Sequence, residues 1–196
     1  MKKQIIIQLL TGLFLMPVVS SYITAQENND LSTFSKDINE QHPANAFSTI
    51  DITNKHGNIA FTAWEKDSIR IDAWVTVKST NSEEGEKVLD QITVHSSRSE
   101  GTLRFQTRFH KEFYSAHPFQ IRYDVYLPGK HTIIANNQFG NVTTTSMTGK
   151  MDIDLKYGDL IQKGLGTIRE LKGNFSFSDV QSGNLQNLNL HLSNTE

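Results

Sequence analysis

Cysteine is absent from the 196-residue chain. A chain without cysteine cannot be a small scaffold held by disulfides, so its stability has to come from a buried core and paired backbone. The missing thiols also exclude the lipidated cysteine of a bacterial lipoprotein and a metal site built on thiolates. With 37% hydrophobic and 20% charged residues, the composition is typical of a folded domain and not of a disordered chain.

The chain also lacks the features that identify several common function classes. Its 19 basic and 21 acidic residues nearly balance and no basic tract stands out, which argues against nucleic acid as a partner. It has no HExxH or GxSxG motif, and its seven histidines show no metal-ligand spacing. The segment GLGTIRELKG lacks the Lys-Ser/Thr ending of a phosphate-binding loop. We therefore expect no catalytic residues, no cofactor and no metal.

Residues 1–25 have the layout of a secretory signal peptide. A basic start, MKKQ, precedes the apolar run IIIQLLTGLFLMPVV, and the small and polar segment SSYITAQ follows. A retained membrane anchor is the alternative, but Gln8, Gly12 and Pro17 interrupt a run that is short for a span of about 20 residues. We expect cleavage after Ala25, no stable membrane span afterwards, and export to the periplasm or to the cell surface and outer membrane.

Residues 26–46 are polar and lack periodicity, which predicts a linker in front of one domain at 47–196. From Phe47 onward apolar and polar residues alternate, as in the stretch IRIDAWVTV from Ile69. Such alternation is typical of strands with one buried face. The sequence therefore predicts an all-β fold.

One segment departs from this alternation. In NSEEGEKVLDQI, Ser82 is a candidate N-cap, acidic residues follow it, and the spacing of three apolar residues matches one face of a helix: Val88, Leu89 and Ile92. Gly85 weakens the pattern. The sequence predicts one short helix over residues 82–91.

A short motif recurs along the chain. An aromatic residue or histidine is followed by glycine, by Asn or Asp, and by an aliphatic residue: KHGNI, QFGNV, KYGDL and, with Ser178 in place of glycine, FSFSDV. Gly140 and Gly158 lie 18 residues apart, a period typical of stacked repeats. We expect glycine to supply a positive φ at each corner, and the rings before it to stack from one copy to the next: Phe139, Tyr157 and Phe177.

These corners predict β-helix-like stacked coils of strand repeats. Alternating residues such as Met151, Ile153 and Leu155 would then face inward and bury a core that no single copy closes alone. An antiparallel meander with Gly-Asn hairpins gives much the same local pattern and remains the alternative. The spacing of the copies favours the coils.

The order of several segments resembles a known family. FSTIDITNKHGNIAFTAW, KVLDQITV, IRYDVYLPGKHTIIANNQFGNV and KYGDL together resemble the DUF4097 family, "putative adhesins" that are common in Bacteroidetes envelopes. The resemblance covers about residues 47–190. It implies an exported protein with a β-strand-repeat, β-helix-like fold, and it provides no catalytic residue to carry over.

The C-terminal end departs from this resemblance. Relatives continue with further coils similar to YGDL, whereas this sequence stops at LHLSNTE. A repeat array needs a polar cap at its end, and Leu188, Leu190 and Leu192 do not provide one. Either the chain is a truncated fragment, or it forms an end-to-end dimer through this end.

Two polar sets are candidates for a site. Asp152 and Asp154 alternate with apolar residues, so both lie on the wet face of a strand about 7 Å apart. A glycoside-cleaving enzyme could use such a pair, but charges that keep a strand soluble are the simpler interpretation. His110 and His117 flank the aromatic-rich loop HKEFYSAHP, which either caps the sheet or binds a ligand.

Aromatic residues are the third candidate. Trp64, Trp74 and Tyr126 fall on or near the polar face of their strands, where exposed rings can stack on sugars or anchor a protein. Coverage by the predicted helix is the favoured alternative. We therefore expect a non-enzymatic envelope protein, an adhesin or scaffold whose partner is an unknown protein or glycan. The alternatives are a β-helix carbohydrate-active enzyme and a periplasmic accessory protein in envelope sensing.

Overall fold

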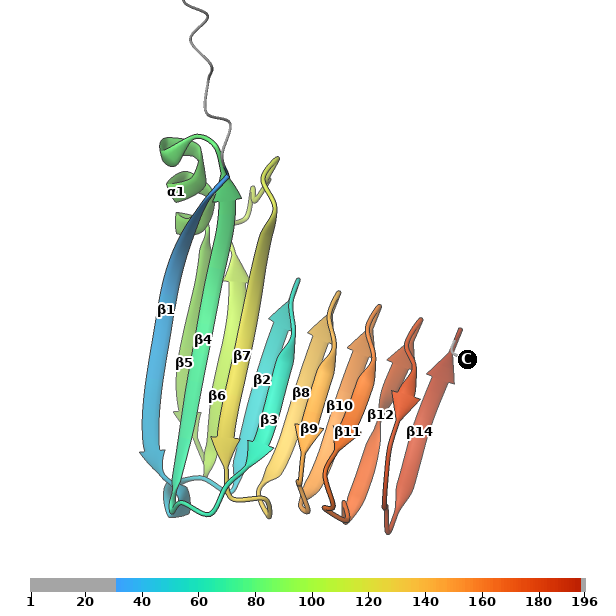
Figure 1. The fold of residues 1–196 in the computed structure, drawn as a ribbon. Coiled ribbons are helices and arrows are strands. Elements are labelled where there is room, and N and C mark those ends of the chain that lie inside the picture. The colour runs from blue at the N-terminus through green and yellow to red at the C-terminus, as the bar shows by residue number, and fades with distance from the viewer. Residues whose placement is uncertain (1–30, 195–196) are drawn as a thin grey trace, which may run out of the picture.

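The structure, a computed structural model, describes residues 31–194, and the predicted signal peptide lies outside them. Within this range the chain is mostly β and forms two seven-stranded sheets packed face to face, with one α-helix (Figure 1). The first sheet has the spatial order β1 (Ser32–Pro43), β4 (Ser68–Ser79), β7 (Phe119–Leu127), β3 (Ile59–Ala63), β9 (Val142–Thr145), β11 (Leu160–Lys163) and β13 (Val180–Gln181). The second has the order β14 (Leu188–Ser193), β12 (Glu170–Ser176), β10 (Lys150–Lys156), β8 (Thr132–Gln138), β2 (Thr49–Lys55), β6 (Thr102–Phe109) and β5 (Ile92–Ser99).

The strands of the C-terminal half pair in parallel and in register. In the second sheet, equivalent residues of β2, β8, β10, β12 and β14 form one column: Ile50, Ile133, Met151, Leu171 and Leu188. In the first sheet the aliphatic residues after the recurring corners form another: Ile59, Val142, Leu160 and Val180. The predicted inward direction of Met151, Ile153 and Leu155 is confirmed, since each is at most 2% exposed. A meander is wrong for these strands, because antiparallel pairs occur only among β1, β4, β7, β5 and β6 in the described range.

The predicted linker is wrong over most of its length, because residues Ser32–Pro43 form β1. This strand pairs antiparallel with β4 along all twelve of its residues. Phe34 and Ile38 pack against the core from the edge of the sheet. An edge strand such as β1 buries its inward-facing residues only in part, so polar residues are tolerated on both of its faces. For this reason the sequence of β1 shows no clear alternation of apolar and polar residues.

The recurring corner uses its glycine differently from the prediction. Positive φ angles, from 52° to 63°, fall on the residue before each corner glycine and before Ser178, which replaces glycine in the last copy: His56, Phe139, Tyr157 and Phe177. The glycines instead allow neighbouring corners to touch. A Cβ atom on Gly140 would lie 2.1 Å from the carbonyl oxygen of Gly57, and one on Gly158 would lie 2.1 Å from that of Gly140. Glycine is required here by close backbone approach and not by its left-handed conformation.

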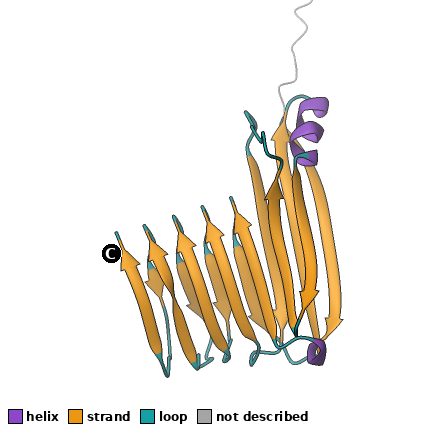
Figure 2. Ribbon diagram, turned by 180° about the vertical axis from the view of Figure 1, so that it is seen from behind, coloured by secondary structure: helices purple, strands orange, loops and turns teal. Residues whose placement is uncertain are grey.

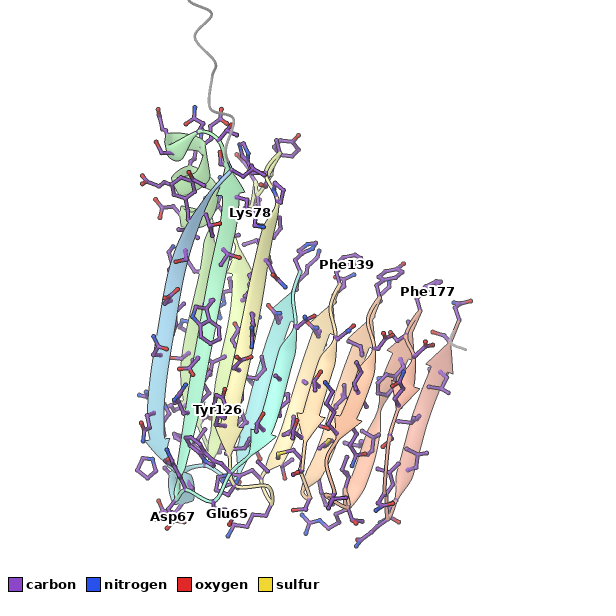
Figure 3. The ribbon with its side chains drawn as sticks, viewed as in Figure 1. Glu65, Asp67, Lys78, Tyr126, Phe139 and Phe177 are labelled. Carbon is purple, nitrogen blue, oxygen red and sulfur yellow. The ribbon has the colours of Figure 1, made fainter. Side chains whose placement is uncertain are left out.

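The predicted stacking of the corner rings is confirmed. His56, Phe139, Tyr157 and Phe177 form a continuous ladder, with successive ring centroids 5.1, 5.1 and 4.9 Å apart and interplanar angles of 13°, 2° and 16°. Figure 3 shows Phe139 and Phe177 along one edge of the molecule. The Asn or Asp of each corner adds a second ladder, in which a side-chain oxygen accepts the backbone N–H of the next corner at 2.8 to 3.1 Å: Asn58, Asn141, Asp159 and Asp179.

A buried polar cluster supports the first two corners. The Asn137 side-chain amide donates to the carbonyls of Gly57 and Gly140, at 2.9 and 2.8 Å. Thr107 donates to the side-chain oxygen of Asn54 at 2.9 Å and lies 2.8 Å from the Tyr123 hydroxyl. Burial raises the pKa of Tyr123 to about 12, so this hydroxyl keeps its proton at neutral pH.

The predicted helix is confirmed as α1 (Ser82–Asp90), and the side chain of Asn81, not Ser82, accepts the capping bond from Glu84 N–H at 3.2 Å. The glycine that weakened the pattern has a packing role. A Cβ atom on Gly85 would lie 2.5 Å from the Phe34 ring, so glycine lets α1 lie close to β1. The helix closes one end of the long strands, and the short 3-10 helix η1 (Ala44–Ala46) lies at the other end (Figure 2).

Replacing His56 with phenylalanine is expected to reduce the loss of stability in acid. Burial lowers the pKa of His56, and the positive charge of Lys55 lowers it further. His56 therefore takes up a proton more readily in the unfolded chain than in the folded one. The free energy of unfolding then falls as the pH drops below the unfolded-state pKa of about 6.5. A phenylalanine continues the ladder without a charge.

Thermal unfolding at pH 7.5 and pH 5.0 measures this effect. His56→Phe should show a smaller fall in Tm between the two conditions than the wild type. His95→Gln, at an exposed position of β5, is the control and should fall as much as the wild type. An unchanged fall in His56→Phe would contradict the assignment.

Candidate binding surface

A second repeated pattern places charged and aromatic residues on the outer face of the first sheet. The sequence Arg-x-Asp-x-aromatic occurs in β4 as RIDAW from Arg70 and in β7 as RYDVY from Arg122. These strands are antiparallel, so the arginine of each copy lies opposite the aromatic residue of the other, and the two aspartates lie opposite each other. The pairs are Arg70–Tyr126, Asp72–Asp124 and Trp74–Arg122.

Each aspartate is neutralised by the arginine two residues before it. Arg122 donates two hydrogen bonds to Asp124, at 2.9 and 2.6 Å, and Arg70 donates from Nε to Asp72 at 2.7 Å. The hydrogen bonds to the aspartates raise the pKa of both guanidinium groups, because each bond favours the charged form of the arginine. Two carboxylates that face each other would otherwise repel. The arginines thus allow both aspartates to lie buried side by side.

Each guanidinium group also lies over one face of the aromatic ring opposite it. Arg70 lies 5.0 Å from the centroid of the Tyr126 ring, and Arg122 lies 5.6 Å from that of the Trp74 ring. Trp64, just after β3, continues this surface with its ring 5.5 Å from Tyr126 and its indole N–H donating to Ser68 O at 2.7 Å. We call the surface the aromatic–arginine patch: Trp64, Arg70, Asp72, Trp74, Arg122, Asp124 and Tyr126.

A shallow hollow of about 520 Å³ lies at one end of the patch and extends beyond it to Thr76 and Gln120. Its lining combines a half-buried indole with hydrogen-bonding side chains: Trp74, Thr76, Gln120, Arg122 and Asp124. The Arg122 side chain is 60% exposed, and its guanidinium has more N–H groups than the two bonds to Asp124 use. Part of an aromatic ring and several fixed hydrogen-bonding groups are therefore available to a ligand.

The predicted coverage of these rings by the helix is wrong. Helix α1 contacts β4, β1 and β5. It packs its apolar side against the core at the end of the long strands, where Val88 and Leu89 are buried. Figure 3 shows Tyr126 near the opposite end of these strands, and Trp64, Trp74 and Tyr126 all remain partly exposed.

The sequence singled out the three aromatic residues but not their charged neighbours. Arg70, Asp72, Arg122 and Asp124 looked like ordinary polar positions of two unrelated strands. The shared Arg-x-Asp-x-aromatic spacing was the available signal. It acquires meaning only when β4 and β7 are known to be antiparallel neighbours.

The candidate carboxylates of β10 hold strands together. Asp152 and Asp154 lie on the outer face, as predicted, and are partly exposed. Asp152 forms an ion pair with Lys172 at 2.9 Å. Asp154 accepts hydrogen bonds from the backbone and the side chain of Asn174, at 3.1 and 2.6 Å. Both carboxylates therefore link β10 to β12.

The aromatic-rich loop caps the first ring of the ladder. Phe113 and Phe119 pack edge to face at 5.1 Å, and the ring of Phe119 lies 5.1 Å from His56. His117 bonds to Glu84 of α1 at 2.9 Å, whereas His110 is exposed. These contacts favour the capping interpretation of the loop. Among the residues that the structure describes, no three His, Asp or Glu side chains come together in a group that could hold a metal.

A larger hollow, of about 770 Å³, lies near η1 and the turn after β7. Its buried polar group is His131, which is 6% exposed. Both ring nitrogens face backbone carbonyls, Nδ1 at 2.8 Å from Pro128 O and Nε2 at 3.0 Å from Ala44 O. The imidazole therefore lies between two loops with backbone oxygens against both ring nitrogens. No nitrogen is left for a ligand, so we favour the aromatic–arginine patch as the site.

No family model matches the chain, and no curated protein matches it. Among solved structures, the chain is similar to a "putative cell adhesion protein" from Clostridium sporogenes, with 7% identity, a TM-score of 0.36, and coverage of 83% of this chain and 98% of that one. It is also similar to a "putative adhesin" from Parabacteroides distasonis (11%, TM-score 0.35, coverage 85% and 81%). A third is a "putative adhesin" from Bacteroides fragilis (13%, TM-score 0.33, coverage 82% and 96%). Membership of the DUF4097 family stays a prediction.

No helix among residues 31–194 combines the length and the apolar character needed to cross a bilayer.

Proposed function

We propose that the chain is an exported, non-enzymatic envelope protein that binds glycan through the aromatic–arginine patch. The observation that carries the proposal is the partly exposed indole of Trp74 in a hollow whose other lining residues are polar. A sugar ring has an apolar face that packs on an aromatic ring and a rim of hydroxyl groups that need hydrogen bonds. Trp74 supplies the first, and Thr76, Gln120 and Arg122 supply the second.

The charge of the patch also favours this ligand. Each carboxylate has an arginine partner, so the four central charges cancel. A surface without net charge does not select a charged ligand, which suits a neutral sugar. Its fixed ion pairs also need no reorganisation on binding. The rigid sheet beneath the patch keeps Trp74 and Arg122 in place, since both belong to the interior of long paired strands.

The fold presents the patch on a scaffold of β-helix-like stacked coils. The corners of these coils lie at Gly57, Gly140 and Gly158. The parallel registers and the two corner ladders support this description. Each coil continues the core of the one before it, so the array extends the sheet that carries the patch.

Export is proposed from residues 1–25, where a basic start, an apolar run and a small-residue exit succeed one another. The periplasm and the outer surface both fit such a protein. Fractionation of cells that produce the tagged full chain tests export: the processed chain should appear outside the cytoplasm. A cytoplasmic chain of full length would contradict it.

Replacing Trp74 with alanine is expected to weaken glycan binding about tenfold, or ~1.4 kcal/mol, because the stacking surface is lost. Residues 26–196 would first be screened on a glycan array, and the strongest ligand would then be titrated by calorimetry. Tyr114→Ala is the matched control, since Tyr114 is an exposed aromatic residue outside the patch. Failure to bind any glycan, or equal affinities of Trp74→Ala and the wild type, would overturn the proposal.

A further inference from the structure

The edge strands at the two ends of the sheet pair differ in their charged side chains. At the N-terminal end, charged side chains bridge the edge strands β1 and β5. Glu40 of β1 pairs with Arg98 of β5 at 3.1 Å. Lys36 of β1 reaches the carboxylate of Asp90 at 3.7 Å and the carbonyl oxygen of Leu89 at 3.2 Å. Charged side chains at a sheet edge oppose pairing with another chain, so this end is protected.

Within residues 31–194, no ion pair protects the edge strands at the C-terminal end of the described array. Strand β14 forms the edge of the second sheet and carries Leu188, Leu190 and Leu192 on the side that faces the core in β12. Their partners in β12 include Leu171 and Phe175, which are fully buried, whereas Leu188 and Leu192 are 58% and 52% exposed. Residues Leu188–Ser193 include no lysine, arginine or carboxylate. Apolar residues that continue the core are therefore exposed along a strand edge without lysine, arginine or carboxylate side chains.

The backbone N–H and C=O groups of β14 that do not bond to β12 belong to the same three leucines. Leu171 N–H donates to Asn187 O, and Phe177 N–H donates to Ser193 O. In a parallel ladder, alternate residues of a strand bond to one neighbour. The odd-numbered residues of β14 therefore bond to β12. The N–H and C=O groups of Leu188, Leu190 and Leu192 point to the open edge.

This edge is complementary to itself. The sequence from Leu188 to Leu192, LNLHL, has the same apolar and polar pattern in both directions. In an antiparallel pair centred on Leu190, each Leu188 lies opposite a Leu192 and each Asn189 lies opposite a His191. All outward backbone groups of the leucines then meet in hydrogen-bonded pairs, and no like charges meet.

We propose that the β14 edge binds a second copy of this chain in a twofold, antiparallel end-to-end dimer. The pairing makes the second sheet continuous between the two protomers and covers the exposed leucines of both. A twofold interface uses the same surface twice, which the self-complementary strand provides. The proposal does not depend on the glycan site, which lies on the outer face of other strands.

Single cysteines test the register, because the wild-type chain contains none. Residues 26–196 with Leu190→Cys should form a disulfide-linked dimer under mild oxidation. Opposite residues of a hydrogen-bonded antiparallel pair have Cα atoms about 5.5 Å apart, within the range of a disulfide. Leu188→Cys alone should not cross-link, because its two copies are offset by four residues, or about 14 Å. A mixture of Leu188→Cys with Leu192→Cys should cross-link.

Light scattering after size exclusion measures the mass of the assembly without a disulfide cross-link. The wild type should have twice the mass of one chain, and Leu190→Arg, which places two charges at the twofold axis, should have the mass of one. Asn189→Arg, whose side chain points to the outer face, should remain a dimer, and circular dichroism confirms that all variants are folded. A monomeric wild type, larger assemblies, or equal cross-linking of the Leu188→Cys and Leu190→Cys variants alone would overturn the proposal.

Discussion

Replacing Gly140 with alanine is expected to destabilise the domain by more than about 3 kcal/mol. The new Cβ atom would lie 2.1 Å from the carbonyl oxygen of Gly57 and 2.5 Å from its carbonyl carbon. These are backbone atoms held by the ladder of β2 and β8, so no side chain can rotate away to make room. Relief requires the two corners to separate, and that movement also breaks the hydrogen bonds from Asn137 to Gly57 and Gly140.

Chemical denaturation with a fluorescence readout measures this loss. Gly183→Ala is the matched control, because the nearest atom to its new Cβ lies 3.7 Å away on the side chain of Gln162. This variant should change the free energy of unfolding by less than about 1 kcal/mol. A Gly140→Ala protein as stable as the control would show that the corners are not in backbone contact.

Replacing Phe175 with alanine is expected to cost about 3 to 5 kcal/mol. Its ring is fully buried in β12, between Leu155 of β10 and Leu192 of β14 in the register. Its loss leaves a cavity beside the last strand, where few elements remain to close it. Domains of this size are stable by about 5 to 15 kcal/mol, so the variant loses a large share of its stability.

Phe177→Ala provides the comparison within the same short segment. Phe177 is 49% exposed and stacks on Tyr157 at 4.9 Å, as the last described ring of the ladder. We expect a loss of about 1 kcal/mol, because the stacked contact goes but no buried cavity forms. Denaturant midpoints of both variants against the wild type test the difference. Equal losses would contradict the placement of Phe175 in the core.

Sequence patterns located the aromatic residues of the site but not the reason for their position. Trp74 and Tyr126 stood on polar faces of their strands, and this much follows from alternation alone. Arg122 lies 48 residues from Trp74 in the sequence, and no local pattern pairs them. Only the antiparallel register of β4 and β7 brings the guanidinium over the indole.

Local patterns by themselves determined which residues face inward, where α1 forms, and where the chain turns. These properties depend on neighbours within a few positions, because side chains alternate along a strand and repeat every turn of a helix. The tertiary structure decided which strands are neighbours, that residues Ser32–Pro43 complete a sheet, and why Gly140 is glycine. The physical reason is that alternation with period two is the same beside any partner strand and in either direction, whereas the register is fixed by contacts between residues far apart in the chain.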